Sequence, residues 1–423
     1  MRDASFACKD RVNIALPGFR MRRAVLLTFC VFLAACASRP IGVLQPTDLP
    51  LGGASTVDML VATTRAPSAD KAILFTGERG ADLSMADVSI SIPPAANREV
   101  GQIQWPRRLP ADPSREFATV AVSPVVGKKQ AQDWLGRNLP ENRSVLIFVH
   151  GFNNRFEDAV YRFAQIVHDS GAKTAPILFT WPSRARIFDY LYDRESTNFS
   201  RDALEDLIRH VAEDRRVGEI TIMAHSMGAW PTMEALRQMS IRDGRVNPKV
   251  RNVILASPDL DIDVFMTQWR SLGEHHPQTY LFSSRRDRAL NFSHTIAGGV
   301  TRLGQIDPTI EPYKSGLERA GITVFDMTNV EGGSDRLNHG QFAQNPEIVQ
   351  IIGNRLIAGQ TVTDNDPSLG ERVGGLALGV GQTVGSAAGL VITAPIAVLD
   401  PESRRRYGDQ VILFGQQGES PAN

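Results

Sequence analysis

Residues 219–228 read Glu-Ile-Thr-Ile-Met-Ala-His-Ser-Met-Gly, a short apolar run that leads into a serine flanked by small residues. The run Glu219–Met223 is typical of a buried β-strand, and the residues from 227 onward are typical of a helix. A serine at such a junction, in the pattern small-x-Ser-x-Gly, indicates the tight turn called a nucleophile elbow. Ala224 stands where the pattern usually has its first glycine, which adds one methyl group. The stretch predicts Ser226 as a nucleophile, with a simple helix cap as the alternative.

Outward from this turn, apolar strand-like runs alternate with helical stretches. The continuous apolar run Ser144–Val149 suits a strand covered on both faces. Further strands are expected at Val57–Ala62, Val88–Ile92, Ala118–Val125, Ala175–Thr180, Val250–Ala256, Thr279–Phe282 and Ile322–Phe325, and helices near 156–170, 200–214, from 227 and near 261–272. The alternation predicts an α/β fold with a mostly parallel sheet, helices on both faces and a β-rich N-terminal portion. A site is then expected along the edge formed by the carboxyl ends of the strands.

The loop after Ser144–Val149 is a candidate for stabilising negative charge. It reads His150-Gly151-Phe152-Asn153. In folds of this kind, that loop supplies one backbone N–H of an oxyanion hole, and the residue after the nucleophile supplies the other. The expected donors are therefore the amides of Phe152 and Met227. The alternative is that Gly151 only opens a turn.

A general base can be found by elimination among the histidines that follow Ser226, because the chain order in such folds is nucleophile, acid, histidine. Those histidines are His275, His276, His294 and His339. The first two precede the strand Thr279–Phe282, and His294 precedes the last predicted strand. His339 follows that strand in a loop rich in Gly and Asn, so we predict His339 as the base.

The acid is less narrowly determined. Asp287 follows the penultimate predicted strand and is the default acid, whereas Asp259 and Asp261 follow the strand before it and remain alternatives. A carboxylate near positive charge stays ionised, as orienting an imidazolium requires. Such charge is expected around Asp287 from its neighbours in sequence, Arg285, Arg286 and Arg288. The alternative for this loop is a salt-bridged surface segment.

The composition excludes several classes of function. The 46 basic and 46 acidic residues give a formal net charge of zero, whereas proteins that bind nucleic acid normally carry a basic excess. The three cysteines are Cys8, Cys30 and Cys36, so the body of the fold has no disulfide framework, zinc-binding cysteines or thiol nucleophile. We expect neither a metal nor an organic cofactor.

The first 35 residues are typical of a targeting segment. Met21-Arg22-Arg23 is followed by a short apolar run, which predicts a signal peptide with Met21 as its true start. The run ends in Leu33-Ala34-Ala35-Cys36, which closely resembles the bacterial lipobox, whose cysteine is lipidated. We expect Cys36 to be lipidated and residues 36–55 to form the anchor and tether of an envelope lipoprotein. A plain signal peptide is the alternative.

The C-terminal residues 359–423 are a Gly- and Ala-rich extension. Val373–Leu399 contains no charged residue. Gly381, Gly385 and Gly389 recur at four-residue spacing, so in a helix they would share one face and allow close contact with another helix. The segment is a candidate for membrane association, but its glycines and its polar residues Gln382, Thr383 and Ser386 favour the alternative of a flexible arm or a helix docked on the hydrolase body.

Together these features resemble the α/β-hydrolase superfamily and, more narrowly, a largely uncharacterised family of bacterial envelope-associated hydrolases. The resemblance covers about residues 57–358, within a hydrolase domain placed at 56–358, and rests on 148–159, Ala164-Gln165, Thr180–Ser183, the elbow, Ser257–Asp259 and Asp287–Leu290. It implies the fold and a serine-hydrolase mechanism, but no particular substrate.

Two functions are consistent with these residues. The first is a serine hydrolase, an esterase or lipase acting on a small ester or acyl substrate with Ser226, Asp287 and His339. Acyl transfer or amide cleavage would use the same residues. The second is a catalytically silent envelope lipoprotein that binds partners through the fold and the glycine-rich extension. The presence of every catalytic part in order favours the first.

Overall fold

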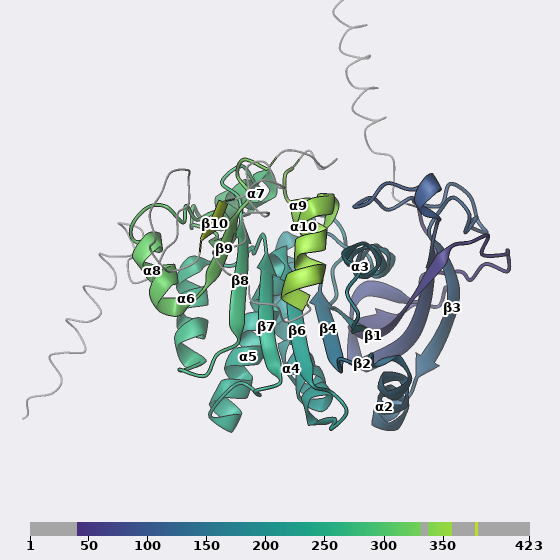
Figure 1. Cartoon of the computed structure of the whole chain (residues 1–423), viewed down its shortest axis with the longest axis horizontal. Helices are drawn as coiled ribbons and strands as arrows, with labels where there is room; N and C mark the ends of the chain where they lie inside the picture. The colour runs from purple at the N-terminus through teal and green to yellow at the C-terminus, as the bar shows by residue number, and fades with distance from the viewer. Residues whose placement is uncertain (1–39, 331–336, 358–376, 380–423) are drawn as a thin grey trace, which may run out of the picture. The chain divides into compact units, whose positions relative to one another are not determined.

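A sheet of ten strands is the centre of the compact unit that begins at Gly42, among the residues that the computed structural model describes, 40–330, 337–357 and 377–379 (Figure 1). The strands are β1 (Ser55–Pro67), β2 (Phe75–Ile92), β3 (Ala118–Val125), β4 (Ser144–Val149), β5 (Ala175–Thr180), β6 (Glu219–His225), β7 (Val250–Ala256), β8 (Gln278–Ser283), β9 (Thr323–Asp326) and β10 (Ala377–Gly379). Their order is β10-β9-β8-β7-β6-β4-β5-β1-β2-β3. From β9 through β1 all neighbours pair in parallel, whereas β2, β3 and β10 pair antiparallel.

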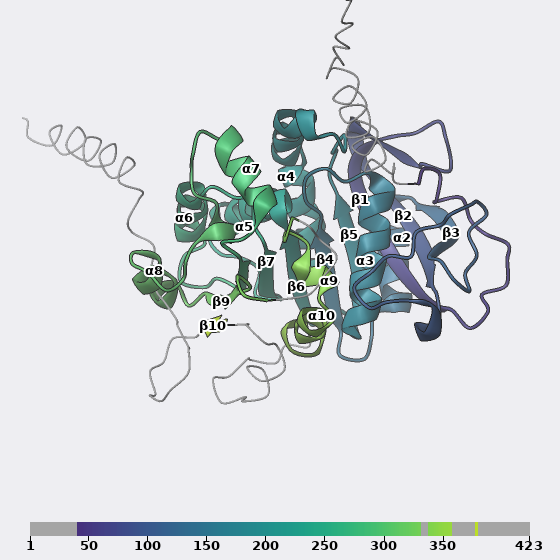
Figure 2. The same ribbon diagram turned by 90° about the horizontal axis from the view of Figure 1, so that it is seen from above.

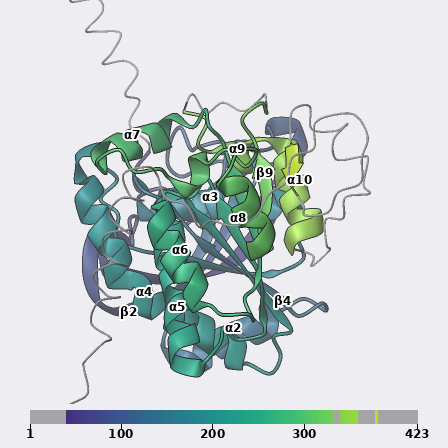
Figure 3. The ribbon, with the colours of Figure 1, turned by 90° about the vertical axis from the view of Figure 1, so that its left-hand side faces the viewer.

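Helices cover both faces of the sheet. They are α2 (Gly127–Asn138), α3 (Phe156–Ser170), α4 (Tyr190–Glu213), α5 (Ala229–Asp243), α6 (Ile262–Ser271), α7 (Arg288–Ile296), α8 (Tyr313–Ala320), α9 (Gln341–Gln344) and α10 (Pro346–Ile351), with short turns η1 (Ala95–Asn97), η2 (Ile187–Asp189), η3 (Ser226–Gly228) and η4 (Leu303–Gln305) and a π-helical turn η5 (Ile352–Ile357). Helices α3 and α10 pack on one face, and α4, α5 and α6 pack on the other (Figure 2). Seen from the side, α5 and α6 lie next to each other along the sheet (Figure 3).

The continuous apolar strands divide their side chains between two cores. In β4, Val145, Ile147 and Val149 point to the core beneath α4 and α5. Leu146 and Phe148 alternate with them and point to the core beneath α3. All six residues of β4 are buried, as expected for a central strand in a sheet covered on both faces.

The predicted fold class is confirmed: the sheet is mostly parallel, helices lie on both faces, and the N-terminal portion is β-rich. Several boundaries differ. β1 and β2 are longer than predicted, because they pair with each other over most of their length. Helix α2 is absent from the prediction, since its sequence is largely polar and buries only Trp134 and Leu135. These differences arise from tertiary pairing rather than from local sequence pattern.

Some predictions concern segments outside the described residues. The signal peptide at 1–35 and the lipidation site Cys36 lie outside them, as does most of Val373–Leu399. Within that last segment the described residues Ala377–Gly379 form β10, antiparallel to β9. In the described part of the chain, every helix is too short or too polar to cross a membrane.

Candidate active site

Ser226 sits in a strained turn between β6 and α5. Its φ of 53° lies in the left-handed region, which costs a non-glycine residue roughly 1–3 kcal/mol and is characteristic of a nucleophile elbow. Two glycines permit the turn. A Cβ on Gly228 would lie 2.4 Å from the carbonyl oxygen of His150, and a Cβ on Gly151 would lie 2.8 Å from the Cβ of Ser226. The serine therefore lies directly beside the loop that follows β4.

His339 and Asp287 form a hydrogen-bonded pair at the same edge of the sheet. His339 Nδ1 lies 2.7 Å from Asp287 Oδ2, and the carboxylate is fully buried while the imidazole is 16% exposed. The carboxylate accepts a hydrogen bond from the Nδ1–H group, so the lone pair of the neutral ring is on Nε2, the atom that a general base uses. Asp287 also accepts a hydrogen bond from the Leu290 amide and so caps α7.

The residue before the serine connects the elbow with the His339 loop. His225 Nε2 donates to the His339 carbonyl oxygen at 3.3 Å, and the two imidazole rings have centroids 4.8 Å apart. The His225 ring also packs on Phe342, with centroids 4.6 Å apart. Burial, together with the nearby His339, holds the pKa of His225 well below its usual value, so His225 stays neutral. These contacts place His225, the residue next to the predicted nucleophile, beside the predicted base.

The alternative acids are occupied elsewhere. Asp259 is buried, lies 3.3 Å from Arg302 Nε and accepts hydrogen bonds from the hydroxyls of Tyr190 and Ser293. Asp261 caps α6 by accepting the amides of residues 263 and 264. Neither contacts His339, whereas Asp287 does. His294 donates to the Val300 carbonyl oxygen instead of facing the elbow.

Of the three arginines expected around Asp287, Arg285 binds other carboxylates. Arg285 turns away from Asp287 and forms ion pairs with Asp307 at 2.7 Å and Asp326 at 3.4 Å. These two carboxylates, from the segment before α8 and the end of β9, attract the guanidinium more directly than the buried Asp287. The partners of the Asp287 carboxylate include His339 and the Leu290 amide.

Sequence reasoning missed a buried cation beneath the loop after β4. Arg65, on β1, is fully buried. Its guanidinium has five N–H groups, and five acceptors surround it: the Thr180 hydroxyl at 2.6 Å, His150 Nε2 at 3.4 Å, and the carbonyl oxygens of Asn154 at 2.8 Å, Ser183 at 3.0 Å and Thr76 at 3.2 Å. Arg65 thus ties β1, β2, β5 and the candidate oxyanion loop together. A lone arginine in a strand carries no motif that would reveal this role.

Burial lowers the pKa of Arg65 to about 10, and the nearby carboxylates of Asp193, Glu157 and Asp158 oppose this effect. The side chain therefore stays charged at neutral pH. The positive charge lies behind the loop that would hold a developing oxyanion, where a positive potential favours negative charge.

His150, at the end of β4, is fixed in one tautomer. Its Nδ1 donates to the Gly151 carbonyl oxygen at 2.8 Å, and its Nε2 accepts from the Trp181 amide at 3.2 Å. The ring stacks on the Trp181 indole at 4.8 Å. Burial, with the neighbouring Arg65, lowers the pKa of His150 to about 3, so this histidine is a structural support rather than a proton carrier.

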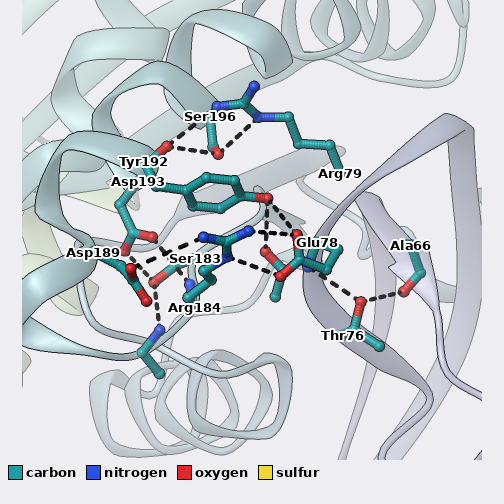
Figure 4. Close-up of polar contacts among 12 residues, drawn as sticks. Ala66, Thr76, Glu78, Arg79, Ser183, Arg184, Asp189, Tyr192, Asp193 and Ser196 are labelled. Atoms are coloured by element: carbon teal, nitrogen blue, oxygen red, sulfur yellow. Dashed lines mark hydrogen bonds and ion pairs between the residues drawn. The ribbon is translucent and has the colours of Figure 1, made fainter.

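A second buried side chain holds the other side of the loop. Asp193, on α4, accepts hydrogen bonds from the Ser183 hydroxyl, the Arg184 amide at 3.0 Å and, at 3.5 Å, the Asn153 amide (Figure 4). Asn153 has a φ of 59°, a conformation that asparagine tolerates better than most residues. The candidate oxyanion loop is therefore held from β1 and from α4.

No group of three or more His, Cys, Asp and Glu side chains is placed to hold a metal ion within the described ranges.

The sheet order, the elbow and the pair of His339 and Asp287 define an α/β-hydrolase. The chain belongs to the family described as alpha/beta hydrolase of unknown function (DUF900), whose model matches residues 127–355. The match includes the elbow, Asp287 and His339 but begins after β3, so Arg65 lies outside it. No curated protein sequence matches the chain.

Among solved structures, the chain is similar to the lin2722 gene product of Listeria innocua, with a TM-score of 0.34 and 11% identity over 52% of this chain and 95% of that one. It is also similar to a hyperthermophilic esterase from Pyrobaculum calidifontis, with a TM-score of 0.32 and 11% identity over 80% of this chain and 93% of the esterase. At such TM-scores neither likeness adds to the assignment, which rests on the family model.

Replacing Arg65 by lysine should loosen the candidate oxyanion loop. Lysine offers three donors in place of five, which leaves buried acceptors without partners at about 1–3 kcal/mol each. We expect a fall in the free energy of unfolding and faster amide hydrogen exchange at 151–154. Both quantities are measurable by denaturant titration and by exchange with mass spectrometry.

Arg98→Lys is a matched control, because the Arg98 side chain is also buried and pairs with Asp169 at 2.5 Å, on α3. It should lower stability without a selective change at 151–154. If both variants raised exchange equally in that loop, Arg65 would have only a general role in stability.

Proposed function

We propose that this protein is a serine hydrolase that cleaves carboxylic esters, of the esterase or lipase type. The observation that carries the proposal is the 2.7 Å contact between His339 Nδ1 and Asp287 Oδ2, beside an elbow in which Ser226 has a φ of 53°. An imidazole whose Nδ1 is held by a buried carboxylate has the orientation and tautomer of a general base. The membership in an α/β-hydrolase family supports the hydrolase class.

In the proposed reaction, His339 Nε2 takes the proton of the Ser226 hydroxyl while the serine oxygen attacks the ester carbonyl carbon. The resulting tetrahedral intermediate collapses, the bond to the alcohol oxygen breaks, and His339 returns the proton to the leaving alcohol. A water molecule then attacks the acyl-serine with the same base and releases the carboxylic acid. Asp287 keeps the imidazole oriented and stabilises its charged form in both halves.

The backbone amides of Phe152 and Met227 are the proposed oxyanion donors. Supporting this assignment, Met227 follows the nucleophile in the buried turn η3, and the Phe152 loop passes within van der Waals distance of the serine. Two fixed donors of this kind stabilise the developing negative charge by several kcal/mol in total. The charge of Arg65 behind the loop acts in the same direction.

We further propose that the enzyme works in the bacterial cell envelope as a lipoprotein. The basis is the sequence Leu33-Ala34-Ala35-Cys36 after a short apolar run. Lipidation of Cys36 would add more than one acyl chain, and stable membrane residence needs at least two such signals.

Ser226→Ala should abolish ester hydrolysis, with a loss of roughly 10⁶-fold in kcat, and labelling by a fluorophosphonate probe. Assays with p-nitrophenyl esters and in-gel fluorescence would measure both. Ser226→Gly is a useful second variant, because glycine accepts the positive φ and should keep the fold. Folded variants that still react with the probe would refute Ser226 as the nucleophile, and a wild type without activity on any ester would favour the silent lipoprotein.

Asp287→Asn should lower kcat by about 10⁴-fold, since the asparagine NH2 group can donate to Nδ1 and so favours the wrong imidazole tautomer. Asparagine still caps helices well, so α7 should persist. Asp261→Asn is the matched control: it also replaces a capping aspartate, on α6, and should leave kcat nearly unchanged. Equal losses in the two variants would mean that Asp287 acts only as a helix cap.

Cys36→Ser should remove the acyl mass from the mature protein and shift it out of the membrane fraction or leave it unprocessed. Intact-mass measurement and cell fractionation would detect either result. Cys30→Ser, six residues earlier in the apolar run, should leave lipidation unchanged. A wild-type protein without acyl mass on Cys36 would rule out the lipoprotein proposal.

A further inference from the structure

Large apolar side chains are exposed around the candidate active site. They come from η2 and the start of α4, from α7, and from the loop before His339. The six members are Ile187, Phe188, Leu191, Phe292, Ile296 and Leu337, and we refer to them as the apolar rim. Phe188 is 100% exposed, and Leu191 is 65% exposed. Exposed apolar side chains gathered in this way indicate an interaction surface.

Hydrogen bonds and ring contacts hold the parts of the rim around the catalytic edge. The Tyr190 hydroxyl, between Phe188 and Leu191 in sequence, lies 2.8 Å from the Ser293 hydroxyl, the neighbour of Phe292 on α7. The Tyr190 ring packs edge-on against Phe152 of the candidate oxyanion loop, with centroids 5.2 Å apart.

On the other side, the amide of Arg288 donates to the carbonyl oxygen of Leu337 at 2.9 Å, two residues before His339. Helix α7 itself is capped at its start by Asp287, the residue that binds His339. The apolar rim therefore borders the proposed catalytic residues on two sides. Residues at the start of α4 form one side, and residues of α7 form the other.

The segment that carries Phe188 is fixed by the contacts of its neighbours. The Phe188 side chain is therefore exposed on an ordered part of the surface. Arg184 forms two hydrogen bonds with the Glu78 carboxylate, at 2.8 and 2.9 Å, and its guanidinium lies 3.6 Å from the centroid of the Tyr192 ring (Figure 4). Asp193 accepts the Arg184 amide at 3.0 Å. Glu78 comes from β2 and Tyr192 from α4, so η2 is fixed between contacts to both.

Positive charge accompanies the apolar rim. Arg186 is exposed next to Ile187, and Arg286 and Arg288 are exposed at the start of α7. Asp189, in the same turn as Phe188, lies 3.9 Å from Arg184, which offsets its charge. Apolar side chains flanked by arginines are the pattern by which proteins lie on anionic lipid, with apolar groups in the acyl boundary and cations at the headgroups.

We propose that the apolar rim docks the protein on an anionic lipid surface, so that the ester reaches Ser226 from that surface rather than from free solution. The part that concerns substrate delivery rests on the proposed esterase function, whereas the docking itself does not. Lipid is the occupant that fits both features, because it supplies apolar chains for Phe188 and Leu191 and negative headgroups for the arginines.

The test uses the full chain with Cys36→Ser, which removes acylation, and vesicles of phosphatidylcholine with or without phosphatidylglycerol. Phe188→Asp should weaken binding to the mixed vesicles at least about tenfold in a sedimentation assay. The exposed Phe188 ring would enter the acyl boundary, whereas the aspartate carboxylate stays in water. Ile241→Asp is the matched control, since Ile241 is 62% exposed on α5, away from the rim, and this variant should bind as the parent does.

Arg186→Gln should weaken binding to the mixed vesicles more than to phosphatidylcholine alone. Hydrolysis of a water-soluble short ester should be the same in Phe188→Asp and the parent, whereas hydrolysis of an ester embedded in the vesicles should fall with binding. These two assays separate the two proposals. A parent that hydrolyses no ester would refute the proposed esterase function, whereas vesicle binding would still test the proposed docking of the apolar rim.

Two results would overturn the docking proposal. One is equal vesicle binding by the parent and Phe188→Asp. The other is a parent that is dimeric without lipid and becomes monomeric on Phe188→Asp, which would make the rim an interface between two copies of the chain. Size-exclusion chromatography with light scattering detects that outcome.

Discussion

The close approach of the elbow to the end of β4 is the constraint on which the site depends. A Cβ on Gly228 would lie within 2.7 Å of two carbonyl oxygens, those of Val149 and His150, so only glycine fits. β4 and β6 are neighbours in the ladder, with Val149 paired to Ala224, and the turn has no room to move away. Ser226 must then adopt a positive φ, and the loop after β4 must pass beside it. One packing contact thus fixes the positions of both the proposed nucleophile and the neighbouring backbone amides.

That loop would not be fixed by β4 and β6 alone. Its far side rests on Arg65, from a strand outside the family match, and on Asp193, from α4. A buried guanidinium is unfavourable unless its donors and its charge are satisfied. Here five acceptors surround it, and Asp193 is among the carboxylates whose field favours the cation. The N-terminal strand β1 is therefore part of the framework that holds the candidate oxyanion loop.

The sequence was sufficient to predict features with a local signature. β3, β4, β5, β7 and α3 have the predicted bounds because their apolar periodicity is set by the sheet face or helix face they bury. The prediction of Ser226, Asp287 and His339 rests on the chain order of nucleophile, acid and histidine in folds of this kind, and it stays a prediction. Helix α2 escaped prediction because it buries few side chains. The role of Arg65 escaped prediction because its partners are mostly carbonyl oxygens from distant segments, which no spacing rule encodes. The partner of Arg285 escaped prediction because Asp307 lies 22 residues further along the chain.

Asp287 connects the chemistry with the surrounding surface. One of its carboxylate oxygens binds His339, and the other accepts the Leu290 amide at the start of α7. The direction of α7, and with it the position of Phe292, is therefore tied to the same carboxylate that binds the proposed base His339. Tyr190 makes the corresponding connection on the α4 side, since it contacts both Phe152 and Ser293. A shift of α4 or α7 would move the edge of the site together with its exposed apolar side chains. The apolar rim is therefore structurally coupled to the proposed catalytic residues.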